Sequence, residues 1–263
     1  MSKIEMPKID MPKLDMPKLD MSKLGMTKAK KVKIKKPTIV IFDMDGTTVR
    51  HVNPAFLHFL EMLDNLLYKL KRPFRRKRKL TDYSRDPARP RGLLVHRMLH
   101  KFRRKSVDQI VQPCPGIFSL LKFFRSQNIP IGLASNGLGK GYGHDILEKF
   151  DLADYFNCEI FREDVEKSKP HPDGLMRCLR QLKPDFNEND VVWHIGDRAK
   201  DVKATLNADK IAECQFVPFA YGINAAIAIL QTKVSNEHII ITYPDFLEYS
   251  KDVFGIEEDL ENR

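Results

Sequence analysis

The chain has 263 residues, of which 42% are hydrophobic and 30% charged, and it carries a formal net charge of +10. This length supports one large domain or two small ones, and the hydrophobic content excludes disorder throughout. No apolar run approaches the roughly 20 residues of a membrane-spanning helix, and the first residues lack the apolar core of a secretory signal. The cysteines, which are Cys114, Cys158, Cys178 and Cys214, lie far apart. That spacing argues against a zinc ribbon or disulfide scaffold and favours reduced thiols in a cytoplasmic protein.

The positive charge is concentrated in two segments. Residues 1–36 contain 11 Lys against 4 acidic residues, and residues 50–113 contain 17 Lys and Arg against 5 acidic residues. Residues 114–263 have the opposite balance, with 17 basic and 24 acidic residues. An acidic body with two basic appendages favours an anionic substrate or partner, whereas a basic surface that only aids solubility is the simpler alternative.

The first basic segment begins with a five-residue repeat. Residues 1–30 read MSKIE, MPKID, MPKLD, MPKLD, MSKLG and MTKAK. A period of five matches neither a helix nor a strand, and the prolines remove backbone donors. We therefore predict that residues 1–36 form a disordered, basic tail. Such a tail would suit an anionic membrane surface or a protein partner, and a tail without a specific ligand is the alternative.

From Pro37 onward the pattern is that of an α/β domain. Apolar runs predict strands at 38–42, 129–135, 191–197, 211–219 and 238–243. Apolar residues at helical spacing predict helices at 116–127, 172–182, 200–207 and 244–251. Strands that alternate with helices predict a Rossmann-like, mostly parallel sheet with helices on both faces. Ligands of such sheets bind beyond the carboxyl ends of the strands.

Residues suited to binding or catalysis follow the ends of three of these strands, and one more lies near the start of a helix. In chain order they are Asp43, Asp45, Gly46 and Thr47 after the first strand, Ser135 and Asn136 after the second, Lys169 near the start of a helix, and Asp197 and Asp201 after the third strand. Because the carboxyl ends of parallel strands share one edge of a sheet, we expect these groups to lie together. The sequence thus predicts one site with two acid pairs, a hydroxyl and a lysine.

This order of residues resembles the four motifs of the haloacid dehalogenase (HAD) superfamily. The first motif reads DxDGT at 43–47, the second falls at Ser135, the third is Lys169-Pro170, and the fourth is Gly196-Asp197 with Asp201. The resemblance covers about 160 residues and implies a HAD-like core made of residues 37–49 and 114–263. The segments KPHPD and GDRAKD look most like the phosphoglycolate-phosphatase-like subgroup.

Each residue of the four motifs suits a step in the transfer of a phosphoryl group. Asp43 is expected to be ionised and to attack phosphorus, forming an aspartyl-phosphate. Repulsion between its carboxylate and the phosphoryl group calls for Mg²⁺, which favours oxygen ligands. The expected metal-binding residues are Asp43, Asp197, Asp201 and, through its backbone oxygen, Asp45; the expected phosphate-binding residues are Gly46, Thr47, Ser135, Asn136 and Lys169.

Asp45 is the expected general acid and base. It would give a proton to the leaving oxygen, with its pKa raised by the neighbouring carboxylates, and would then activate the hydrolytic water. The resemblance implies that this second acid favours phosphomonoester hydrolysis, because dehalogenases lack it. A phosphomutase is the nearest alternative. A binding or adaptor protein, with the α/β body as its scaffold, is the competing class.

Residues 50–113 lie between the first and second motifs, where the family resemblance implies a mobile helical cap. Residues 54–70 and 92–103 predict two helices, and the Arg-rich stretch 69–91 between them contains three prolines. The expected anion contacts are Arg75, Arg76 and Arg78. A substrate phosphate, a nucleic-acid end, a phosphoinositide head group and an anionic membrane remain open as partners, and so does a loop that only steers small anions.

Overall fold

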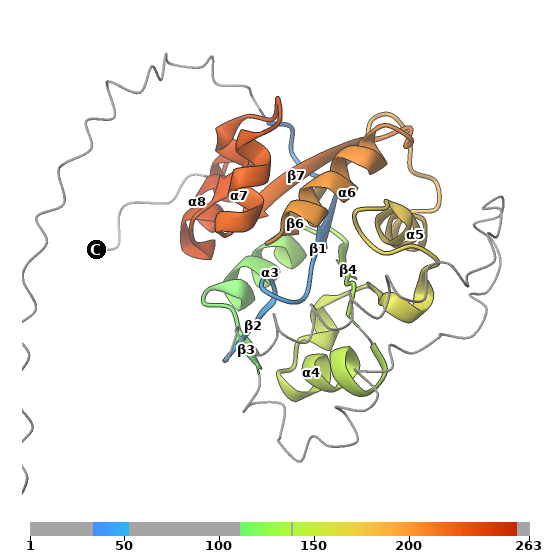
Figure 1. The fold of residues 1–263 in the computed structure, drawn as a ribbon. Coiled ribbons are helices and arrows are strands. Elements are labelled where there is room, and N and C mark those ends of the chain that lie inside the picture. Colours follow the sequence, from blue (N-terminus) through green and yellow to red (C-terminus); the bar gives the residue numbers. More distant parts are fainter. Residues whose placement is uncertain (1–33, 53–110, 138, 257–263) are drawn as a thin grey trace, which may run out of the picture. The chain divides into compact units, whose positions relative to one another are not determined.

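The computed structural model describes residues 34–52, 111–137 and 139–256 (Figure 1). Residues 1–33 of the predicted tail, both predicted cap helices, and Arg75, Arg76 and Arg78 lie outside the described residues. The division of the chain into tail, core and cap therefore remains a prediction.

A parallel sheet of six strands forms the centre of the described domain. In spatial order the strands are β5 (Cys158–Ile160), β4 (Ile131–Ala134), β1 (Ile39–Phe42), β6 (Val191–Gly196), β7 (Gln215–Tyr221) and β8 (Ile239–Ile240). Each neighbouring pair is parallel. Every residue of β1 and β6 is buried, as expected for strands covered on both faces. The predicted α/β class with a Rossmann-like parallel sheet is confirmed.

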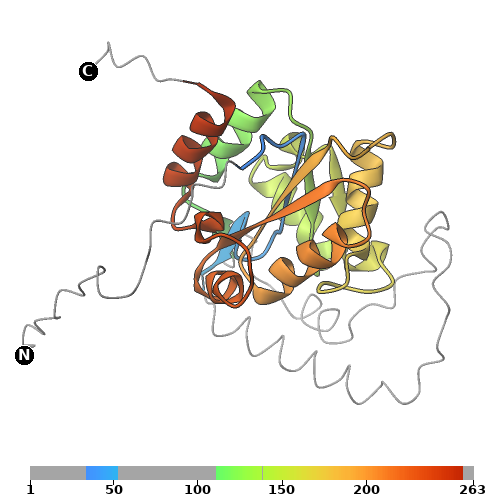
Figure 2. The ribbon, with the colours of Figure 1, turned by 90° about the horizontal axis from the view of Figure 1, so that it is seen from above.

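Helices cover both faces of this sheet (Figure 2). They are α3 (Ile117–Ser126), α4 (His144–Lys149), α5 (Asp173–Leu182), α6 (Ala199–Asp209), α7 (Ile223–Leu230) and α8 (Tyr243–Phe254). Short helical turns are the π-helical turn η4 (Gly139–Gly143) and the 3-10 turns η5 (Ala153–Tyr155), η6 (Arg162–Asp164) and η7 (Asn236–His238).

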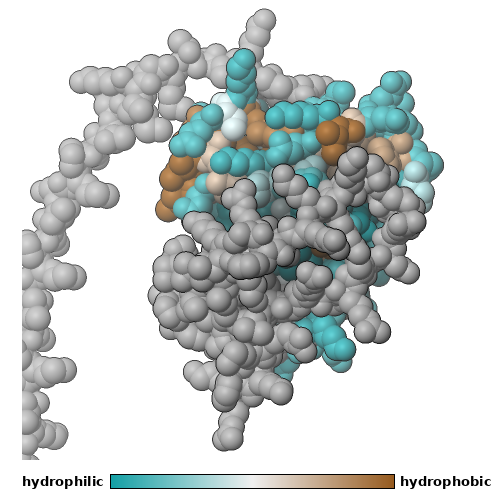
Figure 3. Space-filling view, turned by 45° about the vertical axis from the view of Figure 1, so that its right-hand side comes forward, coloured by the Kyte–Doolittle hydropathy of each residue, from teal (hydrophilic) through white to brown (hydrophobic). Residues whose placement is uncertain are grey.

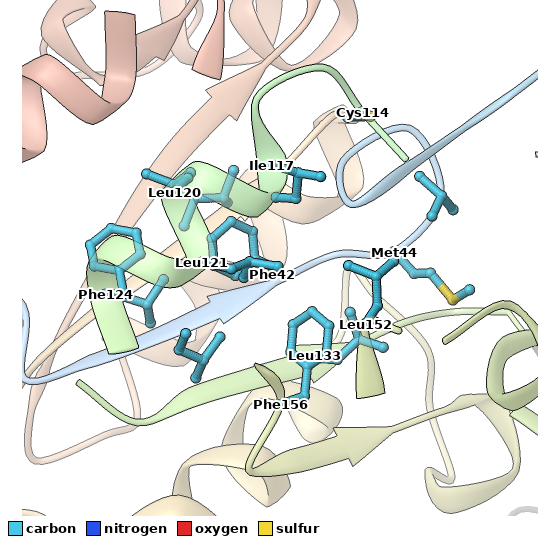
Figure 4. Packing of buried hydrophobic residues seen from close by; sticks show 14 of the residues in the cluster. Phe42, Met44, Cys114, Ile117, Leu120, Leu121, Phe124, Leu133, Leu152 and Phe156 are labelled. Carbon is cyan, nitrogen blue, oxygen red and sulfur yellow. The ribbon is translucent and has the colours of Figure 1, made fainter. Parts of the chain in front are cut away.

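The alternation of side chains along β1 explains the two layers. Val40 and Phe42 pack in one hydrophobic cluster with residues of α3 and α8, whereas Ile39 and Ile41 pack in another with residues of α5 and α6. Figure 4 shows the first layer, where the α3 side chains lie against β1. The ring of Phe124 lies 6.4 Å from that of Phe42 and 6.2 Å from that of Trp193, centroid to centroid.

A second, two-stranded sheet lies beyond the carboxyl end of β1. Its strands, β2 (Val49–His51) and β3 (Val111–Pro113), pair antiparallel, with His51 opposite Val111. They flank the segment between the first and second motifs, so both ends of that segment leave the core side by side. This hairpin was not predicted from the sequence.

Two predicted strands have different bounds in the structure. The run at 211–219 becomes a strand only from Gln215, because α6 extends to Asp209 and a turn follows it. The run at 238–243 forms only the two residues of β8, because Thr242 caps the next helix by accepting a hydrogen bond from the amide of Asp245 at 3.2 Å. Strand β5 and helices α4 and α7 were not predicted from the sequence either.

Among the residues that carry a hydropathy colour in Figure 3, hydrophilic side chains predominate and apolar ones gather in places between them. The exposed large apolar residues include Ile223, Ile227 and Leu230, which recur at helical spacing on α7. Within the described part of the chain, no helix is both long enough and apolar enough to cross a membrane.

The packing of α3 gives a test of the core. Replacing the fully buried Phe124 by Ala is expected to lower the free energy of unfolding by about 3–5 kcal/mol, because it leaves a cavity between α3 and the sheet at β1 and β6. The exposed Ser119 on the same helix provides the control, and Ser119→Ala is expected to change stability by less than about 0.5 kcal/mol. Urea unfolding followed by circular dichroism measures both. Equal effects of the two substitutions would contradict this description of the core.

Candidate active site

The predicted polar residues gather at one edge of the sheet. β1 lies between β4 and β6, and all three strands run parallel. Asp43 follows β1, Ser135 follows β4 and Asp197 follows β6. The amide of Asp43 donates to the carbonyl of Ile195 at 2.8 Å, which joins the first motif to the residue of β6 that precedes the fourth motif. The expected convergence of the motifs is therefore observed.

Three carboxylates form a compact cluster at this edge. Asp43, Asp197 and Asp201 each offer one oxygen, and these oxygens lie within 4.8 Å of one another. Asp43 and Asp201 are only 5% and 1% exposed. Gly46 makes room for the cluster, since a side chain there would collide with the carboxylate of Asp197, and its φ of 86° is in the left-handed region that favours glycine.

Lys169 is the positive charge inside the cluster. Its ammonium contacts Asp43 Oδ1 at 2.5 Å and Asp201 Oδ1 at 2.7 Å, and it donates to the carbonyl of Ala134 at 2.8 Å. Asn136 holds the lysine loop in place: its side-chain amide donates to the carbonyl of Lys169 at 3.1 Å, and its side-chain oxygen accepts from the amide of Lys169 at 2.9 Å. The Asn136 side chain thus positions the third motif.

The cluster holds more negative charge than one lysine balances. Burial raises the pKa of Asp43 to about 6, against the opposing effect of the Lys169 ammonium. Burial and then the carboxylates of Asp43 and Asp201 raise the pKa of Asp197 to about 8. Burial has the same effect on Asp201, but the nearby Lys169 ammonium outweighs it and holds the pKa of Asp201 below its usual range.

These residues fit a divalent cation. Oδ1 of Asp197 is buried and has no hydrogen-bond partner among the described residues, although carboxylate oxygens in such positions are normally paired. The donor set consists of oxygen atoms, which Mg²⁺ prefers. The side chains that would hold the ion are those of Asp43, Asp197 and Asp201. The expected ligation through the backbone oxygen of Asp45 stays a prediction.

The side chain of Asp45 points elsewhere and has its own partners. Its Oδ1 accepts a hydrogen bond from the hydroxyl of Tyr142 at 2.6 Å and lies 3.0 Å from Nε2 of His51. Burial acts to raise the pKa of Asp45, but the contacts with His51 and Tyr142 outweigh it, and the pKa lies below its ordinary value. The expectation that neighbouring carboxylates raise this pKa is therefore wrong for the structure as it stands.

The remaining predicted phosphate-binding residues surround the same edge. Ser135 is buried, and its hydroxyl oxygen accepts from the amide of Gly137 at 2.9 Å. The amides of Gly46 and Thr47 donate within their own turn, to the carbonyls of Val49 at 2.7 Å and Met44 at 3.3 Å. The hydroxyl of Thr47 is buried without a hydrogen-bond partner in the described part of the chain. Phosphate binding by these residues stays a prediction.

Sequence reasoning missed His51 and Tyr142. His51 falls in the hairpin at the base of the predicted cap, and Tyr142 falls in a glycine-rich turn that resembles no motif. No local signal in either segment indicates a contact with Asp45: Tyr142 lies 97 positions away, and His51, six positions away, belongs to no motif.

Comparison with known proteins identifies the family. The chain matches the family model for haloacid dehalogenase-like hydrolases over residues 40–211. The chain belongs to this family. All four motifs described above fall inside the matched residues.

Individual relatives of this HAD-type chain are distant. It is 25% identical over 143 residues to the phosphoglycolate phosphatase of Escherichia coli (strain K12), and 24% identical over 143 residues to that of Salmonella paratyphi A. Each alignment covers 54% of this chain and 54% of the relative, so the chain spans about half the length of the curated relatives it matches. These names agree with the subgroup that KPHPD and GDRAKD indicate.

Solved structures share the HAD-type fold. A predicted phosphoglycolate phosphatase from Haemophilus somnus 129PT superposes with a TM-score of 0.55 at 18% identity, covering 82% of this chain and 99% of the other. A β-phosphoglucomutase from Clostridium difficile superposes with a TM-score of 0.52 at 16% identity, covering 84% and 100%. A phosphatase and a mutase thus match almost equally well, and the fold does not decide between the two reactions.

The carboxylate cluster predicts a cation-dependent stability. We expect Mg²⁺ at about 100 times its Kd to stabilise the protein by about 2.7 kcal/mol, and Asp197→Asn to remove most of this gain. Without the cation, the folded protein keeps Asp197 protonated up to about pH 8, whereas an unfolded Asp ionises above about pH 4. Stability in EDTA therefore falls as the pH rises through this window, and the gain from Mg²⁺ grows.

Thermal unfolding in EDTA and in Mg²⁺ at several pH values measures this effect. Asp252→Asn, at an exposed position on α8, is the control and should keep the full response to Mg²⁺. An unchanged response in Asp197→Asn would rule out this cluster as the cation site.

Proposed function

We propose that the chain is a Mg²⁺-dependent phosphomonoester hydrolase that acts through an aspartyl-phosphate on Asp43. The observation that carries this proposal is the placement of Asp43: its carboxylate is buried at the carboxyl end of a central strand, in contact with Lys169 and beside two further carboxylates. Family membership and the names of the relatives support it. Bound Mg²⁺ would supply the positive charge that lets a carboxylate approach a phosphoryl group.

In the first step, an oxygen of Asp43 attacks the phosphorus and the bond from phosphorus to the leaving oxygen breaks. Lys169 holds the Asp43 carboxylate in place and offsets negative charge that develops on the phosphoryl oxygens. The hydroxyl of Ser135 donates to one of those oxygens. The leaving oxygen takes a proton from Asp45, whose pKa rises when the phosphate, a like charge, binds beside it.

In the second step, water attacks the phosphorus of the aspartyl-phosphate. Asp45, now ionised, removes a proton from that water, and the bond from phosphorus to the Asp43 oxygen breaks. Inorganic phosphate leaves and the carboxylate of Asp43 is restored. The atoms balance as the hydrolysis of one phosphomonoester to an alcohol and phosphate.

The substrate we propose is a small, anionic phosphorylated compound of the phosphoglycolate type. The basic composition of residues 50–113 and the names of the relatives support this class. A further contact of the basic cap or tail with an anionic membrane or nucleic acid stays a prediction. All four cysteines are buried and free, which supports a cytoplasmic setting.

Release of inorganic phosphate from an aryl phosphate tests the reaction. We expect turnover with Mg²⁺, none with EDTA, and a loss of at least about 10³-fold in Asp43→Asn, because the nucleophile is gone. Asp252→Asn, which is remote from the site, should retain wild-type turnover. Absence of turnover by folded, Mg²⁺-binding wild-type protein would refute the hydrolase proposal. Recovery of an isomerised sugar phosphate instead of phosphate would assign a mutase.

The predicted anion contacts of the cap have a separate test. Replacing Arg75, Arg76 and Arg78 together by Ser should raise KM for a carboxylated alkyl phosphate by about tenfold, because guanidinium groups bind carboxylate and phosphate oxygens. The KM for an aryl phosphate without a second charge should change by less than about twofold. Steady-state kinetics on the two substrates measures the difference. An equal change in both would show that the three arginines do not select the substrate.

A further inference from the structure

Asp45, His51 and Tyr142 form a closed triangle of polar atoms. The Tyr142 hydroxyl donates to Asp45 Oδ1 at 2.6 Å, and Nε2 of His51 lies 3.0 Å from that oxygen and 2.8 Å from the Tyr142 hydroxyl. The three residues come from three segments: the turn after β1, strand β2 and turn η4. In Figure 1 the β2–β3 hairpin and α4, which follows η4, lie at the same end of the sheet.

The proton count of the triangle is consistent. The Tyr142 hydroxyl has one proton, which it donates in the hydrogen bond to Asp45. Its oxygen can therefore accept a hydrogen bond from His51. Nε2 of His51 must then carry a proton and donate it toward the Tyr142 and Asp45 oxygens. Both donors therefore converge on one oxygen of the Asp45 carboxylate.

The two donors are themselves fixed by packing. The side chain of His51 is 5% exposed and Tyr142 is 6% exposed. Their rings lie nearly parallel, with an interplanar angle of 15° and centroids 6.3 Å apart. A buried donor held in one rotamer fixes the orientation of the group it binds.

The second oxygen of Asp45 lies on the side of the predicted phosphate-binding residues. A Cβ built on Gly137 would come within 3.1 Å of Asp45 Oδ2 and 3.2 Å of Ser135 Oγ, so both oxygens border the same small space. Oδ1 is thus held by His51 and Tyr142, while Oδ2 faces the region of Ser135.

We propose that His51 and Tyr142 are positioning residues that aim Oδ2 of Asp45 at the leaving oxygen and at the hydrolytic water. This inference rests on the proposed phosphatase function. General acid and base catalysis requires the acid within hydrogen-bond reach of the proton it transfers, so the orientation of Asp45 sets the rate of both steps. The β2–β3 hairpin, at the base of the predicted cap, thereby supplies His51, one of the two side chains that orient Asp45.

Two substrates that differ in their leaving group separate positioning from folding. An alkyl phosphate expels a poor leaving group that needs a proton, whereas a dinitrophenyl phosphate expels a stable phenolate that does not. In Tyr142→Phe and His51→Ala, we expect kcat/KM for the alkyl phosphate to fall about 10- to 100-fold. For the dinitrophenyl phosphate it should stay within about threefold, since formation of the aspartyl-phosphate then needs no acid.

The turnover number adds a second readout. For the dinitrophenyl phosphate, kcat should fall in both variants and an initial burst of phenolate should appear, because hydrolysis of the aspartyl-phosphate still requires Asp45 as a base. His51→Gln, which keeps an N–H donor, should recover part of the alkyl phosphate activity. Tyr155→Phe, the same change at a tyrosine in η5 that packs on Phe118, is the control and should behave as wild type.

Three outcomes are distinguishable. A loss of kcat/KM confined to the alkyl phosphate, with an unchanged melting temperature in Tyr142→Phe, supports the positioning role. An equal loss of kcat/KM on both substrates, or no loss on either, overturns it. Absence of Mg²⁺-dependent turnover in the wild-type protein refutes instead the phosphatase function on which the inference rests.

Discussion

The ammonium of Lys169 is the contact on which the arrangement of the site depends. It lies between the carboxylates of Asp43 and Asp201 and also binds the carbonyl of Ala134, so one cation joins the ends of β1 and β4 to the first turn of α6. All three side chains are almost fully buried. Removing one partner of a buried ion pair leaves an uncompensated charge and costs about 3–5 kcal/mol. The motifs are thus coupled energetically as well as placed close together.

The same cluster shows why this edge of the sheet suits phosphate chemistry. Lys169 offsets only part of the negative charge of the three carboxylates. Burial, and then the negative charge of Asp43 and Asp201, raise the pKa of Asp197 to about 8. A divalent cation bound there would relieve that repulsion, and the combined positive charge would attract a phosphate. The buried, unpaired Oδ1 of Asp197 and the glycine at position 46, which leaves room for that carboxylate, agree with this role.

The two acids of the first motif lie in different surroundings. Asp43 and Asp45 are two residues apart, yet burial raises the pKa of Asp43, whereas His51 and Tyr142 bring that of Asp45 below its usual value against the effect of burial. One acid lies in the charge cluster, and the other contacts His51 and Tyr142. Two carboxylates with different surroundings are suited to different tasks, which in the proposed mechanism are those of nucleophile and proton carrier.

The amino-acid pattern is sufficient to predict the sheet class, the central strands and the members of the charge cluster. Strands β1, β4 and β6 are buried on both faces, so they read as continuous apolar runs, and parallel neighbours must present their carboxyl ends together. The edges of the sheet are harder to predict, because β5 has only three residues and β8 only two, which leaves little pattern to detect. Helix α7 was missed because its apolar residues do not alternate with polar ones.

The surroundings of Asp45, by contrast, depend on how the chain packs in three dimensions. The contact between Asp45 and Tyr142 spans 97 residues, and His51 reaches the same oxygen because β2 pairs with β3 across the inserted segment. Neither residue belongs to a periodic pattern or a motif. The direction of the Asp45 pKa shift follows from these two donors, so a prediction from its acidic neighbours in the sequence had the wrong sign. Spacing along a chain fixes which groups meet at a sheet edge, but long-range packing fixes the donors that surround each of them.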